Sequence, residues 1–372
     1  MTGPYAARYA RPDPVRSRDH TAGGWQHAPM ATRLLAADLP IAAAPMAGGA
    51  TTVDLLAATT EAGAFAFLAG GYQAPDALVE QIRLARGHAR PFGVNLFVPA
   101  PPGAPTVDPA ALAAYARRIA PDAAALGATL DPVPVADDDG WAAKVDLLRR
   151  EPVPVVSFTF GAPPAADVAA LRAAGSVVLV TVTTPGEAAA AEDLGADGLV
   201  VQGPRAGGHS GTWDPARAVG DDATADVLAA VAARTRLPLV AAGGVDGGPA
   251  VAALLHAGAQ AVAVGTLLLR TDESGASATH RDALVDPRFG GTVVTRAFTG
   301  RPARALRNGF VDRYDAAAPV GYPQVHHLTR GLRREAAASG DADRLHLWAG
   351  TGHRRAPTGP AGEVVRALAA GL

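Results

Sequence analysis

A glycine-rich segment in the second half of the chain carries a histidine shortly after an apolar run. The apolar residues 198–201 lead into Gln202-Gly203-Pro204-Arg205-Ala206-Gly207-Gly208-His209. Gly207 and Gly208 lack Cβ atoms, so the backbone there can approach a bound molecule closely. A histidine with an ordinary pKa near ~6.5 transfers protons readily at neutral pH, which makes His209 a candidate catalytic base. The alternative interpretation is a solvated histidine on a strand-to-helix turn.

Other residues suited to binding stand in similar positions, where an apolar run ends. Asn95 and Gln202 carry amides that can donate and accept hydrogen bonds, as a planar cofactor with ring nitrogens and carbonyls requires. The turn at Pro45 and Met46 offers an apolar, polarizable surface for the face of such a ring. A buried amide that ties two loops together is the alternative role for Asn95 and for Gln202.

The chain repeats one unit eight times, a short apolar run followed by a segment with a helical pattern. Continuous apolar runs are typical of strands that are buried on both faces, as in parallel sheets. Eight such units predict a TIM (β/α)8 barrel, with a doubly wound open sheet as the competing topology. The predicted strands are Pro40–Ala44, Ala64–Ala69, Phe92–Leu96, Val153–Phe158, Ser176–Val182, Gly198–Val201, Pro238–Ala242 and Ala261–Val264.

The segments between these runs carry helix signals, including N-terminal caps at Thr52 and Thr184. The predicted helices of the repeat are Thr52–Glu61, Pro75–Gly87, Ala165–Ala174, Pro185–Leu194, Thr224–Arg234, Gly248–His256 and Ser274–Leu284. Residues 99–150 form an insert after the third strand, with helices predicted over 109–119 and 140–150. Residues 286–372 follow the eighth unit and contain one strand-like run, 291–298. We expect the barrel to span 30–285, and the insert and the C-terminal extension to cover its mouth.

The C-terminal ends of barrel strands meet at one face, where barrel enzymes carry their active sites. Phosphate groups commonly bind there in the loops after the seventh and eighth strands, on backbone N–H groups and a helix N-terminus. Gly243 and Gly244 follow the seventh predicted strand, and Gly265 and Thr266 follow the eighth. We therefore expect a phosphate site at these four residues, with the Thr266 hydroxyl as an additional donor.

The composition restricts the partners of the chain and its cellular setting. A formal net charge of −2 argues against nucleic acid or an anionic membrane as the main partner. The sequence contains no cysteine, which excludes disulfides and thiolate chemistry and fits a reducing cytoplasm. No apolar run reaches the ~20 residues of a membrane span. Residues 1–29 are rich in arginine and proline without an apolar period, and we expect them to form a disordered arm.

Together these motifs resemble one enzyme family, nitronate monooxygenase, also called 2-nitropropane dioxygenase. The resemblance covers about residue 39 to the C-terminus, and the tail around residues 322–330 and 347–350 resembles the bacterial class I branch. The motifs that carry it are Ala44-Pro45-Met46, Gly93-Val94-Asn95, Gln202-Gly203-x-x-Ala206-Gly207-Gly208-His209, Ala242-Gly243-Gly244 and Val264-Gly265-Thr266.

This resemblance implies an FMN-dependent barrel that oxidises alkyl nitronates with O2 to a carbonyl compound and nitrite. It implies FMN phosphate on Gly243, Gly244 and the stretch Ala263-Val264-Gly265-Thr266. Flavin contacts are implied for Ala44, Pro45, Met46, Asn95, Gln202, Gly207 and Gly208. His209 is implied as the catalytic base, which removes the α-proton of a neutral nitroalkane. Arg205 departs from the acidic residue of many relatives, a change that could alter the preferred substrate charge.

Three other functions remain open at this point. An FMN-dependent enoyl-thioester reductase would share the barrel, the phosphate site and the histidine loop. A non-flavin isomerase or lyase could bind a phosphorylated substrate on the same loops, because phosphate loops alone do not specify flavin. A non-catalytic flavin or phosphate sensor would leave His209 without a task. The sequence predicts a monomer or a homodimer with small-molecule partners only.

The remaining histidines and one acidic run have structural interpretations. Adjacent residues on a helix point to different faces, so the pair His326-His327 is expected to pack or to face substrate rather than to bind a metal. We expect solvated side chains at His88, His256 and His280. The run 137–139 is expected to cap the helix that begins near Trp141.

Overall fold

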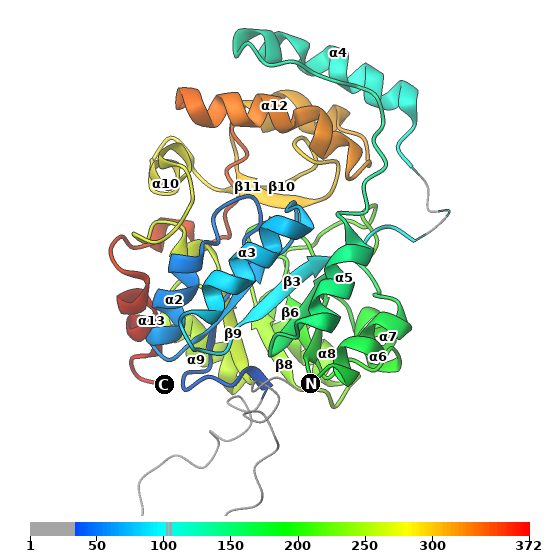
Figure 1. Cartoon of the computed structure of the whole chain (residues 1–372). Helices are drawn as coiled ribbons and strands as arrows, with labels where there is room; N and C mark the ends of the chain where they lie inside the picture. The colour runs from blue at the N-terminus through cyan, green and yellow to red at the C-terminus, as the bar shows by residue number, and fades with distance from the viewer. Residues whose placement is uncertain (1–33, 102, 104–105) are drawn as a thin grey trace, which may run out of the picture.

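Eight parallel strands form a closed barrel in this computed structural model, which describes residues 34–101, 103 and 106–372 (Figure 1). The arm predicted over 1–29 lies outside the described residues. β1 pairs with β9, so the sheet closes and the predicted (β/α)8 barrel is confirmed. The strands are β1 (Ile41–Ala43), β2 (Phe65–Ala69), β3 (Gly93–Phe97), β4 (Val155–Thr159), β5 (Val177–Val182), β6 (Gly198–Gln202), β8 (Leu239–Ala242) and β9 (Ala261–Val264).

Successive side chains of each strand point alternately into the barrel and out toward the helices, and they form two apolar layers. Side chains that point inward fill the barrel, among them Ala42, Phe65, Phe67, Leu179 and Val240. Side chains of the opposite parity pack outward under the surrounding helices, in the largest cluster of the core. Both faces are therefore buried, which is the reason why the strands read as continuous apolar runs.

Seven helices of the surrounding ring lie in or next to their predicted positions. Thr52 caps α2 by accepting a hydrogen bond from the N–H of Leu55 at 2.9 Å, and Thr184 caps α7 in the same way. The helix of 141–150 packs between α3 and α6, so it is the ring helix between β3 and β4. The seven are α2 (Val53–Glu61), α3 (Pro75–Arg86), α5 (Trp141–Arg150), α6 (Ala165–Ala173), α7 (Pro185–Asp193), α8 (Thr224–Ala232) and α9 (Gly248–His256).

The eighth position of the ring differs from the prediction. The segment expected to supply it, Ser274–Leu284, contains only the short helix α10 (Ala278–Ala283), which lies beside the barrel mouth (Figure 1). The last helix of the chain, α13 (Ala361–Ala369), packs against both α2 and α9 instead. The C-terminus therefore completes the ring of helices, next to the point where the strand order closes.

A second layer of elements, here called the cover, lies over the barrel mouth (Figure 1). Helix α4 (Pro109–Ala125) of the insert packs against α12 (Gln324–Ser339) of the C-terminal extension. Under them, β10 (Thr292–Thr295), β11 (Ala303–Leu306) and β7 (Gly208–His209) form an antiparallel sheet. The predicted strand 291–298 is thus present but shorter. α11 (Gly309–Tyr314) completes the cover. The cover has an apolar cluster separate from that of the barrel, which includes Tyr115, Phe298 and Leu328.

No helix in the described part of the chain combines the length and the apolar character that crossing a membrane requires.

Candidate active site

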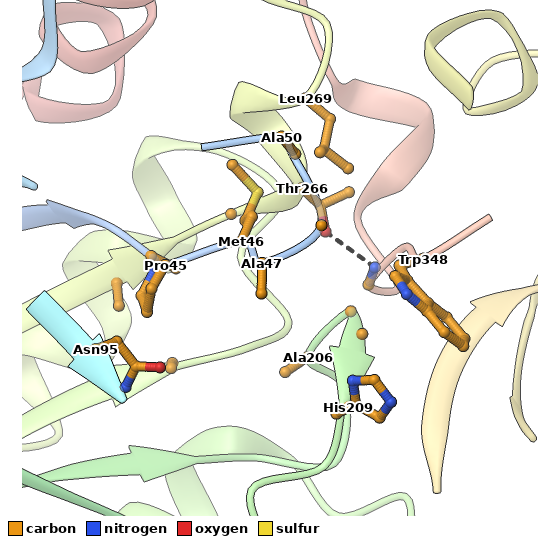
Figure 2. A pocket seen from close by; sticks show the side chains of 18 of the residues that line it. Pro45, Met46, Ala47, Ala50, Asn95, Ala206, His209, Thr266, Leu269 and Trp348 are labelled. Atoms are coloured by element: carbon orange, nitrogen blue, oxygen red, sulfur yellow. Dashed lines mark hydrogen bonds between the residues drawn. The ribbon is translucent and has the colours of Figure 1, made fainter. Parts of the chain in front are cut away.

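A cavity of about 390 Å³ lies between the C-terminal ends of the barrel strands and the cover (Figure 2). The structure brings all of the predicted site residues to its wall. Ala44, Pro45 and Met46 follow β1, Asn95 lies within β3, and Gln202 ends β6. Gly207, Gly208 and His209 come from the loop after β6, where the last two form β7. Those that follow β8 or end and follow β9 are Gly243, Gly244, Ala263, Val264, Gly265 and Thr266.

One end of the cavity presents backbone N–H groups without acceptors. The N–H groups of Gly243, Gly244, Val245 and Gly265 donate no hydrogen bond to any described residue. Gly243 has φ +104°, and a Cβ atom there would lie 2.8 Å from the backbone nitrogen of Ala206, so a side chain is excluded. Unpaired N–H groups that line a cavity can receive an acceptor such as a phosphate, so this end of the cavity is suited to that group.

The C-terminal segment of the chain closes over this end. Thr266 Oγ1 accepts a hydrogen bond from the N–H of Gly350 at 3.0 Å, as Figure 2 shows. A Cβ atom on Gly207 would lie 2.4 Å from the same Gly350 nitrogen, so glycine is required there. The Thr266 hydroxyl retains its own hydrogen for donation, as predicted for an additional phosphate donor.

The backbone of His209 is fixed by two sets of hydrogen bonds. His209 lies in β7, opposite Ala303 of β11, so the cover holds it from one side. From the other side, the Gln202 side chain donates to the His209 carbonyl at 3.1 Å and accepts from the N–H of Gly211 at 2.6 Å. Both the oxygen and the nitrogen of the Gln202 amide are thus bonded to the loop. Gln202 therefore has the structural role, tying a strand end to a loop, that was the alternative to cofactor contact.

The ring of His209 is enclosed by three aromatic side chains. The ring centroids of Trp348, Phe160 and Tyr322 lie 5.3, 5.6 and 5.9 Å from the His209 centroid. Burial, together with the positive charges of Arg301 and Arg333, lowers the pKa of His209 to about 3. The ordinary pKa assumed from the sequence is therefore wrong for this site. The imidazole is therefore neutral at neutral pH, and the same burial makes it a weaker base than a free histidine.

Asn95 presents its amide oxygen to the cavity. Its Nδ2 donates to the Ser157 carbonyl at 3.2 Å, which fixes the orientation of the amide because a carbonyl can only accept. The same nitrogen lies 2.9 Å from Ser157 Oγ and 3.0 Å from Thr159 Oγ1. The Oδ1 atom forms no hydrogen bond with a described residue, which leaves it as an acceptor for a bound molecule.

Several residues of the cavity wall escaped the sequence reasoning. Tyr72 and Phe160 follow β2 and β4 with φ of +66° and +87°, values that non-glycine residues adopt mainly where the surroundings impose them. Trp348 and His346 come from the C-terminal extension. The local signals available were glycines beside strand ends, Gly70-Gly71 before Tyr72 and Gly161 after Phe160, whereas Trp348 and His346 arrive from a distant segment.

Two predictions for titratable residues were wrong. His280 is not solvated: it lines the cavity, its Nε2 lies 2.9 Å from the Trp348 carbonyl oxygen, and burial lowers its pKa to about 4. Gly140, and not a residue of the acidic run, is the N-cap of α5, and the Asp138 carboxylate accepts from the N–H of Gly140 at 3.0 Å rather than from the first turn of the helix. Asp139 instead accepts from the N–H of Tyr72 at 2.9 Å and pairs with Lys144 at 2.8 Å.

The histidine pair and Arg205 take structural roles. His326 stacks on Tyr72, and His327 Nε2 lies 2.9 Å from Asp137 Oδ2, so both side chains pack against other residues as predicted. Their ring centroids lie only 5.4 Å apart, so the two rings do not point to opposite faces. No group of three or more His, Asp or Glu side chains in the described ranges is placed to hold a metal ion. Arg205 turns away from the cavity and donates to the Asp221 carbonyl at 3.1 Å.

Comparison with known proteins agrees with this geometry. The family model for nitronate monooxygenase matches residues 29–371. A nitronate monooxygenase of Pseudomonas aeruginosa is 40% identical over 349 residues, which cover 91% of this chain and 97% of the relative. The chain belongs to the nitronate monooxygenase family. A probable nitronate monooxygenase of Staphylococcus aureus is 32% identical over 90% of this chain and 94% of its own length.

Solved structures extend the family assignment to the fold. The nitroalkane oxidase of Streptomyces ansochromogenes is 47% identical and superposes with a TM-score of 0.86, covering 91% of this chain and 96% of that one. FabK of Thermotoga maritima is 26% identical with a TM-score of 0.71, covering 91% and 93%. The family member described here is therefore an oxidoreductase of the group that oxidises nitro compounds.

Proposed function

We propose that this enzyme binds FMN in the cavity and oxidises alkyl nitronates with O2, yielding a carbonyl compound and nitrite. The observation that carries the proposal is one juxtaposition. Four unpartnered backbone N–H groups stand at one end of the cavity, and a neutral imidazole stands in its wall. When bound, FMN would supply the electron-accepting chemistry that no side chain of the cavity offers.

The residues present fit that cofactor. Backbone N–H groups of Gly243, Gly244, Val245 and Gly265, with the Thr266 hydroxyl, would hold the phosphate. The remaining wall would border the ring system: Ala44, Pro45, Met46, Asn95, Gln202, Gly207, Gly208, Ala263 and Val264. Within that set, Asn95 Oδ1 would accept a hydrogen bond, and Met46 would contribute an apolar face.

His209 would act on neutral nitroalkanes as a general base. Its unprotonated ring would accept the α-proton, and the electron pair of the C–H bond would move toward the nitro group to give the nitronate. A pre-formed nitronate has already lost this proton, so its oxidation would not need the base. We expect His209→Asn to retain the cofactor while losing about 10²- to 10⁴-fold in rate on a nitroalkane, and far less on the nitronate.

The partners would be small molecules, a nitronate or nitroalkane together with O2. The near-neutral formal charge of −2 gives no basis for binding nucleic acid. We place the enzyme in the cytoplasm, as a monomer or a homodimer.

Two measurements on the purified protein test the proposal. The visible spectrum reports bound flavin, and propionate 3-nitronate added in air reports activity through oxygen uptake and nitrite release. A flavin spectrum with nitrite production supports the proposal. A flavin spectrum with oxidation of NAD(P)H by an enoyl thioester, and no nitrite, would replace it with the reductase function. A protein that stays colourless after addition of FMN would point to a phosphate-binding isomerase or lyase.

A further inference from the structure

His209 contacts a buried hydroxyl on the side of its ring that faces the cover. Its Nε2 lies 2.9 Å from Oγ1 of Thr299, a residue only 1% exposed. Its Nδ1 forms no hydrogen bond with any described residue, and Figure 2 shows one ring nitrogen directed into the cavity. The two nitrogens of the ring therefore have different surroundings, and only one of them can meet a substrate.

The Thr299 hydroxyl has a second neighbour that determines which way it donates. Its Oγ1 lies 3.3 Å from the carbonyl oxygen of Arg301, a residue only 5% exposed. No other group among the described residues donates to that carbonyl. A hydroxyl has a single hydrogen, so donation to His209 would leave the buried carbonyl unpaired, which is unfavourable.

One arrangement satisfies all of the groups. The hydroxyl donates to the Arg301 carbonyl, and its oxygen accepts from an N–H at His209 Nε2. A neutral imidazole carries a single ring hydrogen, so Nδ1 is then without one. We propose that Thr299 is the positioning residue that fixes the tautomer of His209, and that Nδ1 is the atom that removes the substrate proton.

The loop of Thr299 is held firmly enough for this role. Gly300 packs so closely on the Gly321 backbone that a Cβ atom would lie 2.8 Å from it. The Ala297 carbonyl accepts from the Tyr115 hydroxyl at 2.6 Å, and the Phe298 carbonyl accepts from the Thr329 hydroxyl. Contacts to α4 and α12 thus anchor the loop to the cover.

The proton transfer conserves atoms, electrons and charge. The α-hydrogen of the nitroalkane leaves as a proton and binds Nδ1, and its bonding electrons remain on the substrate as the nitronate. The imidazolium that forms keeps Nε2–H donated to Thr299 Oγ1. The inference rests on the proposed function for its substrate, but the position of the ring hydrogen can be measured without any turnover.

Nitrogen-15 NMR of the histidine-labelled holoenzyme measures that position directly. The His209 signals are those that vanish in His209→Asn, and they distinguish a protonated from an unprotonated ring nitrogen. We expect a protonated Nε2 and an unprotonated Nδ1 in the native protein. A protonated Nδ1 would overturn the proposal, whether or not the protein oxidises nitronates.

Kinetics of three variants supply the second test. Thr299→Val removes the acceptor, and we expect kcat/KM on a neutral nitroalkane to fall about tenfold or more, with the value on pre-formed nitronate nearly unchanged. Thr299→Ser keeps the hydroxyl and should restore the ratio of the two values. The control is Thr59→Val, which removes a buried hydroxyl without a hydrogen-bond partner from α2. The positioning role would be contradicted if Thr299→Val lowered kcat/KM equally on both substrates. It would also be contradicted if the ratio of kcat/KM on nitroalkane to that on nitronate were the same in Thr299→Val and in the control. Failure of the native protein on both substrates would instead refute the proposed function.

Discussion

The ring of Tyr72 stacks on the ring of His326, with centroids 4.2 Å apart and planes 9° from parallel. Tyr72 follows β2, and His326 lies in the first turn of α12, so this contact joins a strand end of the barrel to the cover. Because the backbone of Tyr72 has φ +66° and donates to Asp139, the ring is presented in a fixed direction. Tyr72, which lines the cavity, is therefore held by an aromatic partner that is distant in the sequence.

A double-mutant cycle with Tyr72→Ala and His326→Ala measures this contact. We expect a coupling free energy of unfolding of about 0.5–1.5 kcal/mol, the range of aromatic pairs in proteins. The control cycle combines Tyr72→Ala with His256→Ala, at an exposed helix end, and should be additive within about 0.5 kcal/mol. Equal coupling in the two cycles would show that the stacking does not stabilise the closed cover.

The glycine pair after β8 should be required for cofactor binding. Gly244 has φ +74°, and a valine there would add backbone strain and press on Arg205, whose Cβ would lie 3.3 Å from the new Cβ, so the loop that presents the unpartnered N–H groups would shift. We expect Gly244→Val to purify without flavin colour. The matched variant is Gly258→Val, which has a positive φ of +103° and open space in the turn after α9. It should remain yellow, and loss of colour in both variants would mean that strain alone releases the cofactor.

The buried histidines should make the fold sensitive to acid. Burial lowers the pKa of His209 to about 3 and that of His280 to about 4, whereas both bind protons below about 6.5 in the unfolded chain. Above about pH 6.5 both histidines are neutral in the folded and in the unfolded chain, and the protein keeps its full stability. As the pH falls from there toward the pKa values in the folded protein, only the unfolded chain binds protons, and the free energy of unfolding decreases. Each of these histidines then lowers the free energy of unfolding by up to about 1.4 kcal/mol per pH unit.

Urea unfolding between pH 7 and pH 5 checks this dependence. Replacing the titrating group in His280→Leu should reduce the slope of the free energy of unfolding with pH. The control, His256→Gln, changes an exposed side chain and should leave the slope as it is. An unchanged slope in His280→Leu would show that His280 binds protons equally in the folded and the unfolded protein, which would contradict the lowered pKa.

Lys144, the one lysine of the chain, should be important for stability. Its side chain is 1% exposed, pairs with Asp139 at 2.8 Å and donates to the Gly70 carbonyl at 2.9 Å. Lys144→Met leaves the Asp139 carboxylate without its cation, and we expect the free energy of unfolding to fall by about 3 kcal/mol. The double variant with Asp139→Asn should recover much of that loss, because the amide oxygen still accepts from Tyr72. A double variant as unstable as the single one would exclude the unpaired charge as the cause.

The barrel was accessible from the sequence because its strands are local features. Each strand is a short apolar run, and the ends of parallel strands meet at one face, so the order of the runs along the chain is enough to place residues such as Asn95 and Gly243 together. The glycines of the phosphate end also carry their own signal, since a missing Cβ marks close backbone approach.

The parts that could not be predicted depend on packing between distant segments. The helical pattern of 274–284 resembles that of a ring helix, but only tertiary contacts decide that α13 takes the place between α2 and α9. Trp348 reaches the cavity from the C-terminal extension, and Thr299 contacts His209 from the cover, although the two residues lie far from the strand ends in the sequence. The pKa of His209 also depends on burial by the cover and on Arg301 and Arg333, which the sequence does not place.

The most direct test of the account is to mix the purified enzyme with an alkyl nitronate in the absence of oxygen. If the cavity oxidises nitronates through bound FMN, the yellow colour of the oxidised flavin disappears, and admission of air restores it and releases nitrite. A flavin that keeps its colour with nitronate but loses it with NAD(P)H would contradict the central claim.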